Sequence, residues 1–499
     1  MKSYTRLGVI CDMHLQNFKA SPQLAFLRLA VEKMKKDSVD AVICLGDITG
    51  FGDVGAWDLY EDAVKEVTHY EVLGNTDVRD AATREILTSR VTDVAFKAGN
   101  KMVYGVNTPD GVITSYDRTR LEALKDGDVI FMHYYMNTLD EESREYLTEL
   151  ASRVSITILH GHGHRVFDYD LEKSHVYGMR GLDPDKAIGD FPTVGYLDLY
   201  EDEVKFQEVA IKLPKSYFLE VQKLFGISCV DNHRDVQYAL ENDVKHIELR
   251  CNGKEWFPDE TLFPLIEKWR EKTGGYLSIH MPNLRYADGN YAGFDKWQEA
   301  LEYGVKLGAD SYTMHPPRVK VCDMPVGGEV WNTFLEPYLN VTKLAKDTAR
   351  MGVENIHKSQ GEAEDETRGF GYIPPEVSAW IDAINEKVGF ERVGHVLDAG
   401  HARNNGNFAK LYPISRWYCI MGNRTIAYHI HQVIAIPGAY KNHNPIENWF
   451  GPMINYSAFI FAMNNGILNK VPVFLEVKGA ENYQKTIDAF QALIDSLEQ

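Results

Sequence analysis

The sequence predicts an α/β protein of two units, in which a layered α/β domain is followed by a (β/α)8 barrel of the TIM type. Short apolar runs alternate with stretches of helical periodicity along the whole chain, which indicates alternating strands and helices. The second part contains eight such runs, the number of strands that close this barrel. In both parts, acidic residues and histidines directly follow apolar runs, and this pattern indicates metal sites at strand ends.

Composition and charge narrow the class of protein. The 499 residues are 44% hydrophobic and 25% charged, which is ordinary globular usage and enough chain for two or three domains. The net charge of −19 disfavours nucleic acid as the main partner, because binding to its phosphates requires a basic face. No apolar run approaches the ~20 residues of a membrane span, and the chain begins without a cationic and apolar leader. We therefore expect no membrane association.

Six cysteines lie at scattered positions and form no C-x-x-C pair. This spacing disfavours both a disulfide framework and a thiolate zinc site. Reduced and mostly buried thiols are expected instead, as in proteins of a reducing compartment. Together with the missing leader, the cysteines indicate a cytoplasmic protein.

Residues 1–213 are expected to form the layered α/β domain. An apolar strand at residues 9–10 is followed by a helix whose apolar residues recur at helical spacing. The region 194–211 alternates like a β-hairpin. Pro214 marks a linker to the second domain. The other strands expected in this domain are residues 41–45, 129–132 and 156–159.

Residues 217–499 are expected to form the barrel. Its eight candidate strands are residues 225–230, 246–250, 276–280, 311–315, 352–356, 393–398, 426–431 and 473–477. Helical patterns separate most of them, as the alternation of a (β/α)8 barrel requires. The irregular and acidic stretch 357–376 follows the fifth strand, on the face where such barrels carry their active sites. We expect it to form a lid or a substrate loop.

Five short motifs of the first domain share one design: CDMH, LGDITG, LGNTD, FMHYY and HGHGH. Each follows an apolar strand, and most place glycine beside the polar residue so that the backbone can turn sharply. Carboxylate, imidazole and amide groups suit a pair of divalent ions, which an aspartate can bridge at about 3.5–4 Å. The candidate ligands are Asp12, His14, Asp47, Asn75, His133, His162 and His164.

These motifs resemble those of the calcineurin-like metallophosphoesterases over residues 5–200. The resemblance implies hydrolysis of a phosphate mono- or diester by two ions of the Mn, Fe, Zn or Ni class. Thr76 departs from the pattern, because many members carry there a histidine that protonates the leaving group. Asp77 is retained and is a candidate substrate-binding residue. The implied ligands of the first ion are Asp12, His14, Asp47 and His164, and those of the second are Asp47, Asn75, His133 and His162.

Acidic residues and histidines also occupy the ends of the candidate barrel strands. These ends converge on one face of a barrel, so residues far apart in sequence can share an ion. The residues are Glu248, His280, His315, Glu354, Asp398, His401, His429, His431 and Glu476.

The phrases LSIHMP, MHPP, VENI, VLDAGH, YHIH and FLEVKG resemble the xylose-isomerase-like barrels, a superfamily of sugar isomerases and epimerases and of endonuclease IV-type phosphodiesterases. The resemblance implies that Glu354, Glu476 and His401 are catalytic and that Glu248 binds substrate. The nuclease-like branch adds two ligands, matched by His280 and His315, and a later Asp-x-His, which here reads Lys441-Asn442-His443 without the aspartate. At least one divalent ion of the Mn, Mg, Co or Zn class is expected, with the ligands Glu354, Asp398, His429 and Glu476.

The sequence therefore predicts a bifunctional metalloenzyme. The first domain is expected to hydrolyse a phosphate ester, and the barrel to isomerise or epimerise a small phosphorylated carbohydrate or polyol. Two alternatives stay open: the barrel is a second metal-dependent phosphoesterase, or it is a non-catalytic substrate-binding or regulatory module. The substrate, the metal identities and the oligomeric state are left open.

Overall fold

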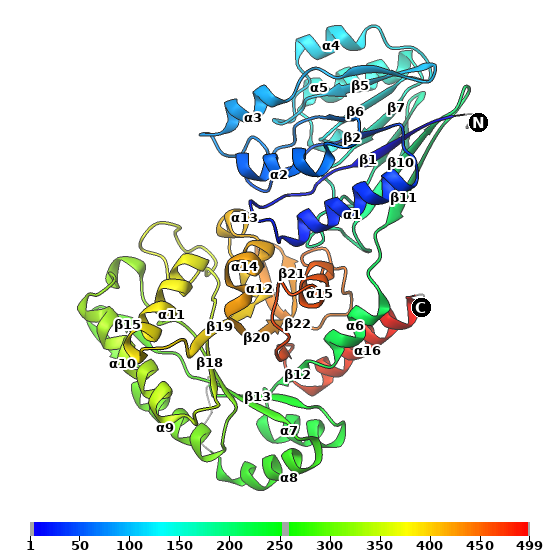
Figure 1. The fold of residues 1–499 in the computed structure, drawn as a ribbon. Coiled ribbons are helices and arrows are strands. Elements are labelled where there is room, and N and C mark those ends of the chain that lie inside the picture. The colour runs from blue at the N-terminus through cyan, green and yellow to red at the C-terminus, as the bar shows by residue number, and fades with distance from the viewer. Residues whose placement is uncertain (1–3, 252–258, 498–499) are drawn as a thin grey trace. The chain divides into compact units, whose positions relative to one another are not determined.

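The computed structural model describes residues 4–251 and 259–497, and it confirms the predicted α/β class with a layered domain and a closed barrel (Figure 1). The chain splits into two compact units. The first unit comprises Met1–Leu213 and Asn455–Ala458, and the second comprises Pro214–Ile454 and Phe459–Gln499.

The first unit contains two sheets. One has five strands in the order β11-β10-β1-β2-β3, and the other has six in the order β4-β5-β6-β7-β9-β8. The strands of the first sheet are β1 (Thr5–Ile10), β2 (Ala41–Cys44), β3 (His69–Glu71), β10 (Thr193–Leu199) and β11 (Val204–Ala210). Those of the second are β4 (Ala95–Ala98), β5 (Lys101–Val106), β6 (Val129–Met132), β7 (Thr157–His160), β8 (Phe167–Leu171) and β9 (Ser174–Gly178).

Alternating side chains build a four-layer sandwich from these sheets. On β6, Val129 and Phe131 pack in one buried cluster with Leu7 and Val9 of β1, so the two sheets face each other. The intervening residues Ile130 and Met132 belong to another cluster, together with residues of two helices. A third cluster packs two more helices on the outer face of the first sheet. The helices are α1 (Pro22–Lys36), α2 (Val54–Val64), α3 (Arg84–Arg90), α4 (Ser115–Leu121) and α5 (Glu141–Arg153).

The second unit is a closed barrel of eight strands, and every neighbouring pair is parallel. The strands are β12 (Phe225–Ser228), β13 (His246–Arg250), β14 (Tyr276–His280), β17 (Ser311–Met314), β18 (Arg350–Glu354), β19 (Val393–Asp398), β20 (Thr425–Ile430) and β23 (Val473–Leu475). All eight overlap the runs that the sequence indicated. The fifth begins two residues earlier than expected, at Arg350, because Arg350 and Met351 already pair with Ser311 and Tyr312 of β17.

Helices follow the strands around the barrel (Figure 1). The longer ones are α6 (Lys215–Gln222), α7 (Asn232–Glu241), α8 (Phe263–Thr273), α9 (Phe294–Lys306), α10 (Glu329–Leu344), α11 (Pro374–Val388), α14 (Ile414–Met421), α15 (Ser457–Asn464) and α16 (Ala480–Ser496). Two hairpins that the sequence analysis did not predict extend the loops after β14 and β20. They are β15 (Arg285–Ala287) with β16 (Asn290–Ala292), and β21 (Gln432–Ile436) with β22 (Ala439–Asn444).

The irregular stretch expected at residues 357–376 runs into the start of α11 and is held by hydrogen bonds within itself and to its neighbours. The half-buried Glu362 carboxylate accepts from the backbone of Ser359 and Gly369 and from the hydroxyl of Tyr372. Outside the stretch, Asn407 donates to the carboxylate of Glu364. The role of a lid or a substrate loop stays a prediction.

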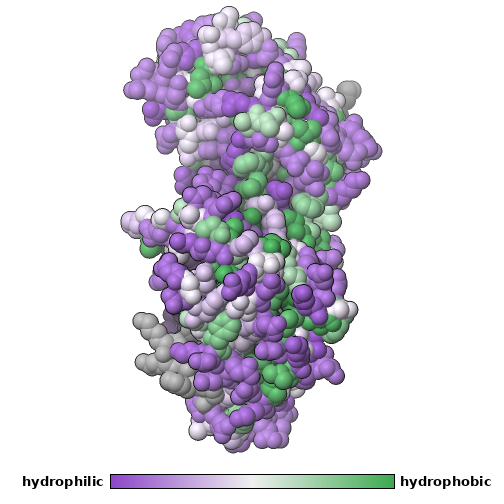
Figure 2. Space-filling model, turned by 90° about the vertical axis from the view of Figure 1, so that its left-hand side faces the viewer, coloured by the Kyte–Doolittle hydropathy of each residue, from purple (hydrophilic) through white to green (hydrophobic). Residues whose placement is uncertain are grey.

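Hydrophilic and hydrophobic residues are interspersed on the face seen in Figure 2. Among the helices of residues 4–251 and 259–497, none combines the length and the apolar character that crossing a membrane demands.

One buried carboxylate joins the first and last strand–helix units of the barrel. Asp235 of α7 is fully buried and accepts hydrogen bonds from the backbone of Val230, at 2.8 Å, and of Ala480, at 3.1 Å. Val230 follows β12, and Ala480 begins α16 after β23. Asp235 therefore fastens the chain across the point where the barrel closes.

We expect Asp235→Asn to lower the free energy of unfolding of the barrel by about 2–3 kcal/mol, because an amide NH2 group replaces a charged acceptor and leaves a buried N–H unpaired. Denaturant unfolding followed by circular dichroism would measure the change. Asp347→Asn is the matched control, because Asp347 is exposed, and it should alter stability by less than about 0.5 kcal/mol. Equal effects of the two substitutions would contradict the role given to Asp235.

Candidate metal centres

The predicted ligands of the first domain converge at the carboxyl ends of its strands. Asp12 and His14 follow β1, Asp47 follows β2, and the others follow β3, β6 and β7. Two groups form, each with ligand atoms within 4.8 Å of one another: Asp12, His14 and His164, and Asp47, His133 and His162.

Asp47 lies between the two groups. Its Oδ2 atom is 3.1 Å from Nε2 of His14, and its Oδ1 atom is 3.4 Å from Nε2 of His133. One carboxylate therefore faces a member of each group, which is the position of a bridging ligand. Gly74 makes this approach possible, because a Cβ atom there would lie 2.2 Å from Oδ1 of Asp47.

The backbone is strained at most of these ligands. A positive φ is uncommon for residues other than glycine, and such strain gathers at functional sites. Five of the seven predicted ligands have it: Asp12 (50°), His14 (46°), Asp47 (54°), His162 (67°) and His164 (51°). The left-handed turns redirect each side chain immediately after its strand, toward the common centre.

Lone pairs converge in the group around His133. Its Nδ1 atom lies 2.9 Å from the carbonyl oxygen of Leu45 and donates to it, so Nε2 of the neutral ring carries a lone pair. That atom is 3.1 Å from Oδ1 of Asn75 and 3.1 Å from Nδ1 of His162. A cation among these acceptors would satisfy all of them at once, so the residues present fit a divalent ion.

A carboxylate that the sequence analysis missed orients His14. Oδ2 of Asp183 lies 3.2 Å from Nδ1 of His14, and its Oδ1 accepts a hydrogen bond from Gln23. Contacts of this kind fix the orientation and tautomer of a ligand histidine. Asp183 lies far along the chain from the motifs, and no spacing rule pointed to it.

The electrostatics give the candidate ligands different protonation states. Burial would raise the pKa of Asp47, but the imidazoles of His133 and His14 hold it well below the ordinary value. Burial lowers the pKa of His164 to about 4, so this ring is neutral. Against the effect of burial, Asp47 raises the pKa of His133 to about 9, and an ion would have to displace that proton.

The contacts of Asp77 are with the backbone of the metal-site loops. Asp77 is fully buried, and its carboxylate accepts from the backbone of Thr49 at 2.7 Å and of Gly74 at 2.9 Å. It fixes the loop that carries Asp47, and the substrate-binding role expected for it stays a prediction. Thr76 is also buried, and its hydroxyl donates to the carbonyl of Thr49 at 2.6 Å.

In the barrel, Glu354 at the end of β18 is the hub of the predicted site. Its Oε2 atom is 3.2 Å from Nε2 of His280 and 3.2 Å from Nε2 of His315. Its Oε1 atom is 3.3 Å from Nδ1 of His401, and that atom lies 3.4 Å from Oδ2 of Asp398. The structure thus brings these candidates together at one end of the barrel.

His429 presents one nitrogen to the same centre. Its Nδ1 atom is 3.4 Å from Oε2 of Glu354 and 3.2 Å from Oε2 of Glu476. Its Nε2 atom is 3.0 Å from Glu248, which also accepts from the hydroxyl of Thr313 at 2.7 Å. Glu248 is fully buried and orients His429, and its expected role in substrate binding stays a prediction.

The four ligands implied for the barrel ion share one property. Each has a buried side-chain atom that forms no hydrogen bond with any residue described in the structure. Buried polar groups are rarely left so, and acceptors meeting at one point suit a divalent cation. The residues present therefore fit the ion. The atoms are Glu354 Oε1, Asp398 Oδ2, His429 Nδ1 and Glu476 Oε2.

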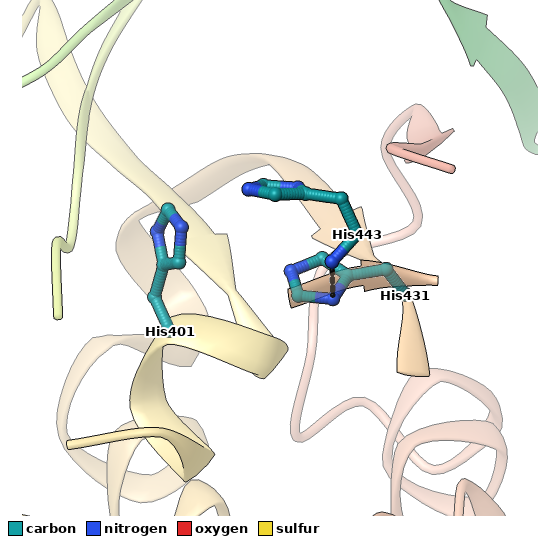
Figure 3. A group of neighbouring side chains, drawn as sticks. All are labelled: His401, His431 and His443. Carbon is teal, nitrogen blue, oxygen red and sulfur yellow. Dashed lines mark hydrogen bonds between the residues drawn. The ribbon is translucent and has the colours of Figure 1, made fainter. Parts of the chain in front are cut away.

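A third group in the barrel consists of His401, His431 and His443 (Figure 3). The backbone N–H of His443 donates to Nδ1 of His431 at 2.9 Å, and Nδ1 of His443 lies 3.3 Å from Oε1 of Glu476. His443 has a φ of 59°, as strained as the ligands of the first domain. The unpredicted hairpin of β21 and β22 carries it here, so strand periodicity alone gave no signal for it.

Arg250 is a further residue that the sequence analysis missed. It ends β13, its guanidinium contacts the Glu476 carboxylate, and its Nε donates to Ser228 at 3.1 Å.

The loop predicted at residues 357–376 lines a cavity of about 400 Å³. The ring of His357 in this loop lies 4.8 Å from that of His401. The remaining lining comes from Asn404, Gly406 and residues 435–440 of the hairpin.

Comparison with known proteins follows the same division. The sequence model of the calcineurin-like phosphoesterase superfamily domain matches residues 5–178, and that of the xylose isomerase-like TIM barrel matches residues 236–495. A search of curated protein sequences finds no match.

Solved structures with similar folds include three with 14% sequence identity. A dimetal phosphatase from Danio rerio covers 41% of this chain and 95% of its own, with a TM-score of 0.32. A D-allulose 3-epimerase from Methylomonas sp. covers 52% and 84%, with a TM-score of 0.37. Endonuclease IV from Thermus thermophilus covers 55% and 99%, with a TM-score of 0.37.

Both families are typically dependent on divalent metals, and both parts of the chain contain groups that could hold them. With the barrel match extending over more than half of its residues, the chain belongs to the xylose isomerase-like TIM barrel family and carries a calcineurin-like phosphoesterase domain at its N-terminal end.

Proposed function

We propose that the protein is a bifunctional metalloenzyme with two separate sites. The N-terminal domain hydrolyses a phosphate mono- or diester, and the barrel isomerises or epimerises a small phosphorylated carbohydrate or polyol. The observation that carries the proposal is the convergence of buried acceptor atoms in each part, around Asp47 in one and around Glu354 in the other. In the barrel, a protein without the ion would leave four buried ligand atoms without a hydrogen bond.

In the N-terminal domain two ions would share Asp47. When bound, such a pair supplies an activated water and positive charge beside a phosphate ester. The chain itself keeps the site rigid: Asp183 holds His14, the carbonyl of Leu45 holds His133, and Asp77 holds the loop around Asp47. One ion would take Asp12, His14, Asp47 and His164, and the other would take Asp47, Asn75, His133 and His162.

In the barrel one ion would be held by Glu354, Asp398, His429 and Glu476. When bound, it would polarise a carbonyl or hydroxyl oxygen of the substrate. Glu248 sets the tautomer of His429, because the N–H at Nε2 donates to the carboxylate and leaves the lone pair of Nδ1 for the ion. Glu354 and Glu476 are the carboxylates placed to move a substrate proton, and His401 lies beside Glu354.

A second candidate function for the barrel is phosphoester hydrolysis. It is favoured by the two further groups of possible ligands, His280 and His315 with Glu354, and His401 with His431 and His443. A site with several ions can neutralise the charge of a phosphate ester, whereas the four ligands proposed for the isomerase would hold one ion. Metal stoichiometry separates the two: one barrel ion supports the isomerase, and three support the hydrolase.

We expect Asp47→Asn to abolish hydrolysis of a generic aryl phosphate, with a loss of orders of magnitude in kcat, because both ions lose their shared ligand. Metal analysis of the purified protein should show two ions fewer than in the parent. Asp62→Asn, which changes an exposed carboxylate of α2, is the matched control and should leave activity and metal content intact. Activity of Asp47→Asn within tenfold of the parent would refute the assignment.

We expect Glu476→Gln to remove barrel turnover and to weaken barrel metal binding, because a neutral amide replaces a charged ligand. Aryl phosphate hydrolysis should stay within about twofold, and a strong chelator should silence both activities. A panel of phosphorylated aldoses and ketoses, with product analysis by NMR, would measure the barrel reaction. Glu481→Gln on the exposed face of α16 is the control.

The independence of the two sites is tested by the same variant. Should Glu476→Gln abolish phosphate hydrolysis in a folded protein that keeps its N-terminal metals, the two sites would not be independent. The barrel would then be part of the phosphoesterase or its regulator.

A further inference from the structure

The loop that follows Asn75 places a cation beside the candidate metal pair of the first domain. Arg79 lies four residues after Asn75, and its guanidinium lies over the ring of Phe51 at 5.8 Å. Nη2 of Arg79 is 2.9 Å from the side-chain amide of Asn75. Among the described residues, no carboxylate forms an ion pair with Arg79, whereas nearby Arg84 pairs with Asp110 and Arg90 with Asp58.

The amide of Asn75 has two orientations with opposite consequences. With its nitrogen toward the histidines, it donates to His133 and His162, and its oxygen accepts from Arg79. That arrangement satisfies both ends of the amide without any ion. With its oxygen toward the histidines, Oδ1 joins the lone pairs of His133 and His162, which is the arrangement that a cation requires.

The second orientation leaves two N–H donors without an acceptor on the other side of the amide. Nδ2 of Asn75 then lies 2.9 Å from Nη2 of Arg79, so two N–H donors face each other and neither has an acceptor there. Donors that converge without an acceptor are satisfied by an anion placed between them. A metal that takes the oxygen of Asn75 therefore prepares an anion site next to itself.

The remaining groups at this point suit a phosphate ester. Tyr134 stacks on His162, with ring centroids 4.4 Å apart, and forms a wall of the same site. Thr76 contributes nothing there, because its hydroxyl is turned to the carbonyl of Thr49. A guanidinium is a permanent cation with a fork of donors that matches phosphoryl oxygens.

We propose that Arg79 is the phosphate receptor of the N-terminal site and neutralises the phosphoryl group during hydrolysis. The proposal rests on the phosphoesterase function proposed above. In that reaction a water oxygen forms a bond to phosphorus, and the bond from phosphorus to the ester oxygen breaks. The attacking water gives up one proton to the solvent, and the ester oxygen leaves with the electron pair and takes up one proton from the solvent. Arg79 keeps its own protons throughout and binds a phosphoryl oxygen.

Substitution of Arg79 tests the proposal through phosphate binding as well as through rate. We expect Arg79→Met to raise the inhibition constant of inorganic phosphate against aryl phosphate hydrolysis at least tenfold. It should lower kcat/KM by about 100-fold, as the loss of one charged donor does in other sites. Arg79→Lys should recover part of this loss, and millimolar guanidinium chloride should partly rescue Arg79→Ala. Metal content should be unchanged in all three variants.

Arg84→Met is the matched control, because Arg84 is an arginine of the same region that pairs with an exposed carboxylate. It should stay within twofold of the parent. Calorimetric titration of inorganic phosphate into the metal-loaded protein, in a Glu476→Gln background, gives a readout independent of turnover. Binding should weaken at least tenfold on Arg79→Met.

Three results would overturn the proposal: an inhibition constant and a calorimetric affinity within twofold of the parent, a loss of metal from Arg79→Met, or no rescue by lysine or guanidinium. A parent protein that hydrolyses no aryl phosphate with Mn, Fe, Zn or Ni would refute the phosphoesterase function instead. The phosphate titration would still decide whether Arg79 binds the anion.

Discussion

Convergence of buried carboxylates and imidazoles on common centres is the constraint on which both halves of this protein depend. These side chains are brought to the ends of strands, where they are shielded from water. Around Asp47 and around Glu354, carboxylate oxygens lie 3.1–3.4 Å from histidine nitrogens, because a charge buried away from water needs partners close by. The two folds differ, since one is a layered sandwich and the other a closed barrel, but each uses the convergence of strand ends to solve the same problem.

Most of the fold could be predicted because its signals are local. Alternation of buried residues on β6 separates two faces of a sheet, and eight apolar runs close a barrel. The hairpin of β21 and β22 was missed because β21 follows β20 after one residue and continues its apolar run, while β22 is mostly polar. Strand ends shifted by a residue or two, as at Arg350, because pairing with a neighbour rather than propensity decides where a strand begins.

The candidate sites could be predicted from the sequence only in part. Residue type and position after a strand were enough to nominate His14, Asp47 and Glu354, and the structure brings these residues into their groups. The direction in which a side chain points was not predictable. Asp77 and Glu248 are carboxylates in the motifs that suggested substrate binding, yet both turn toward neighbouring protein atoms. Asp183 and Arg79 belong to no strand-end motif, and only the fold places them beside the ligands. His443 was indicated only by the resemblance to the nuclease-like branch.

The left-handed backbone of the N-terminal ligands has a consequence for the stability of that domain. Each such residue costs of order 1–3 kcal/mol relative to a relaxed conformation, and five of them adjoin one site. Without metal, therefore, the strained ligands lower the stability of the domain, and the packing of the surrounding sandwich must offset the free energy of this strain. Replacement of His164 by glycine, which adopts this conformation freely, would relieve strain while deleting a ligand. Substitutions that make the metal-free domain more stable at these positions would therefore remove metal ligands and with them the activity. Stability and activity are opposed at these positions.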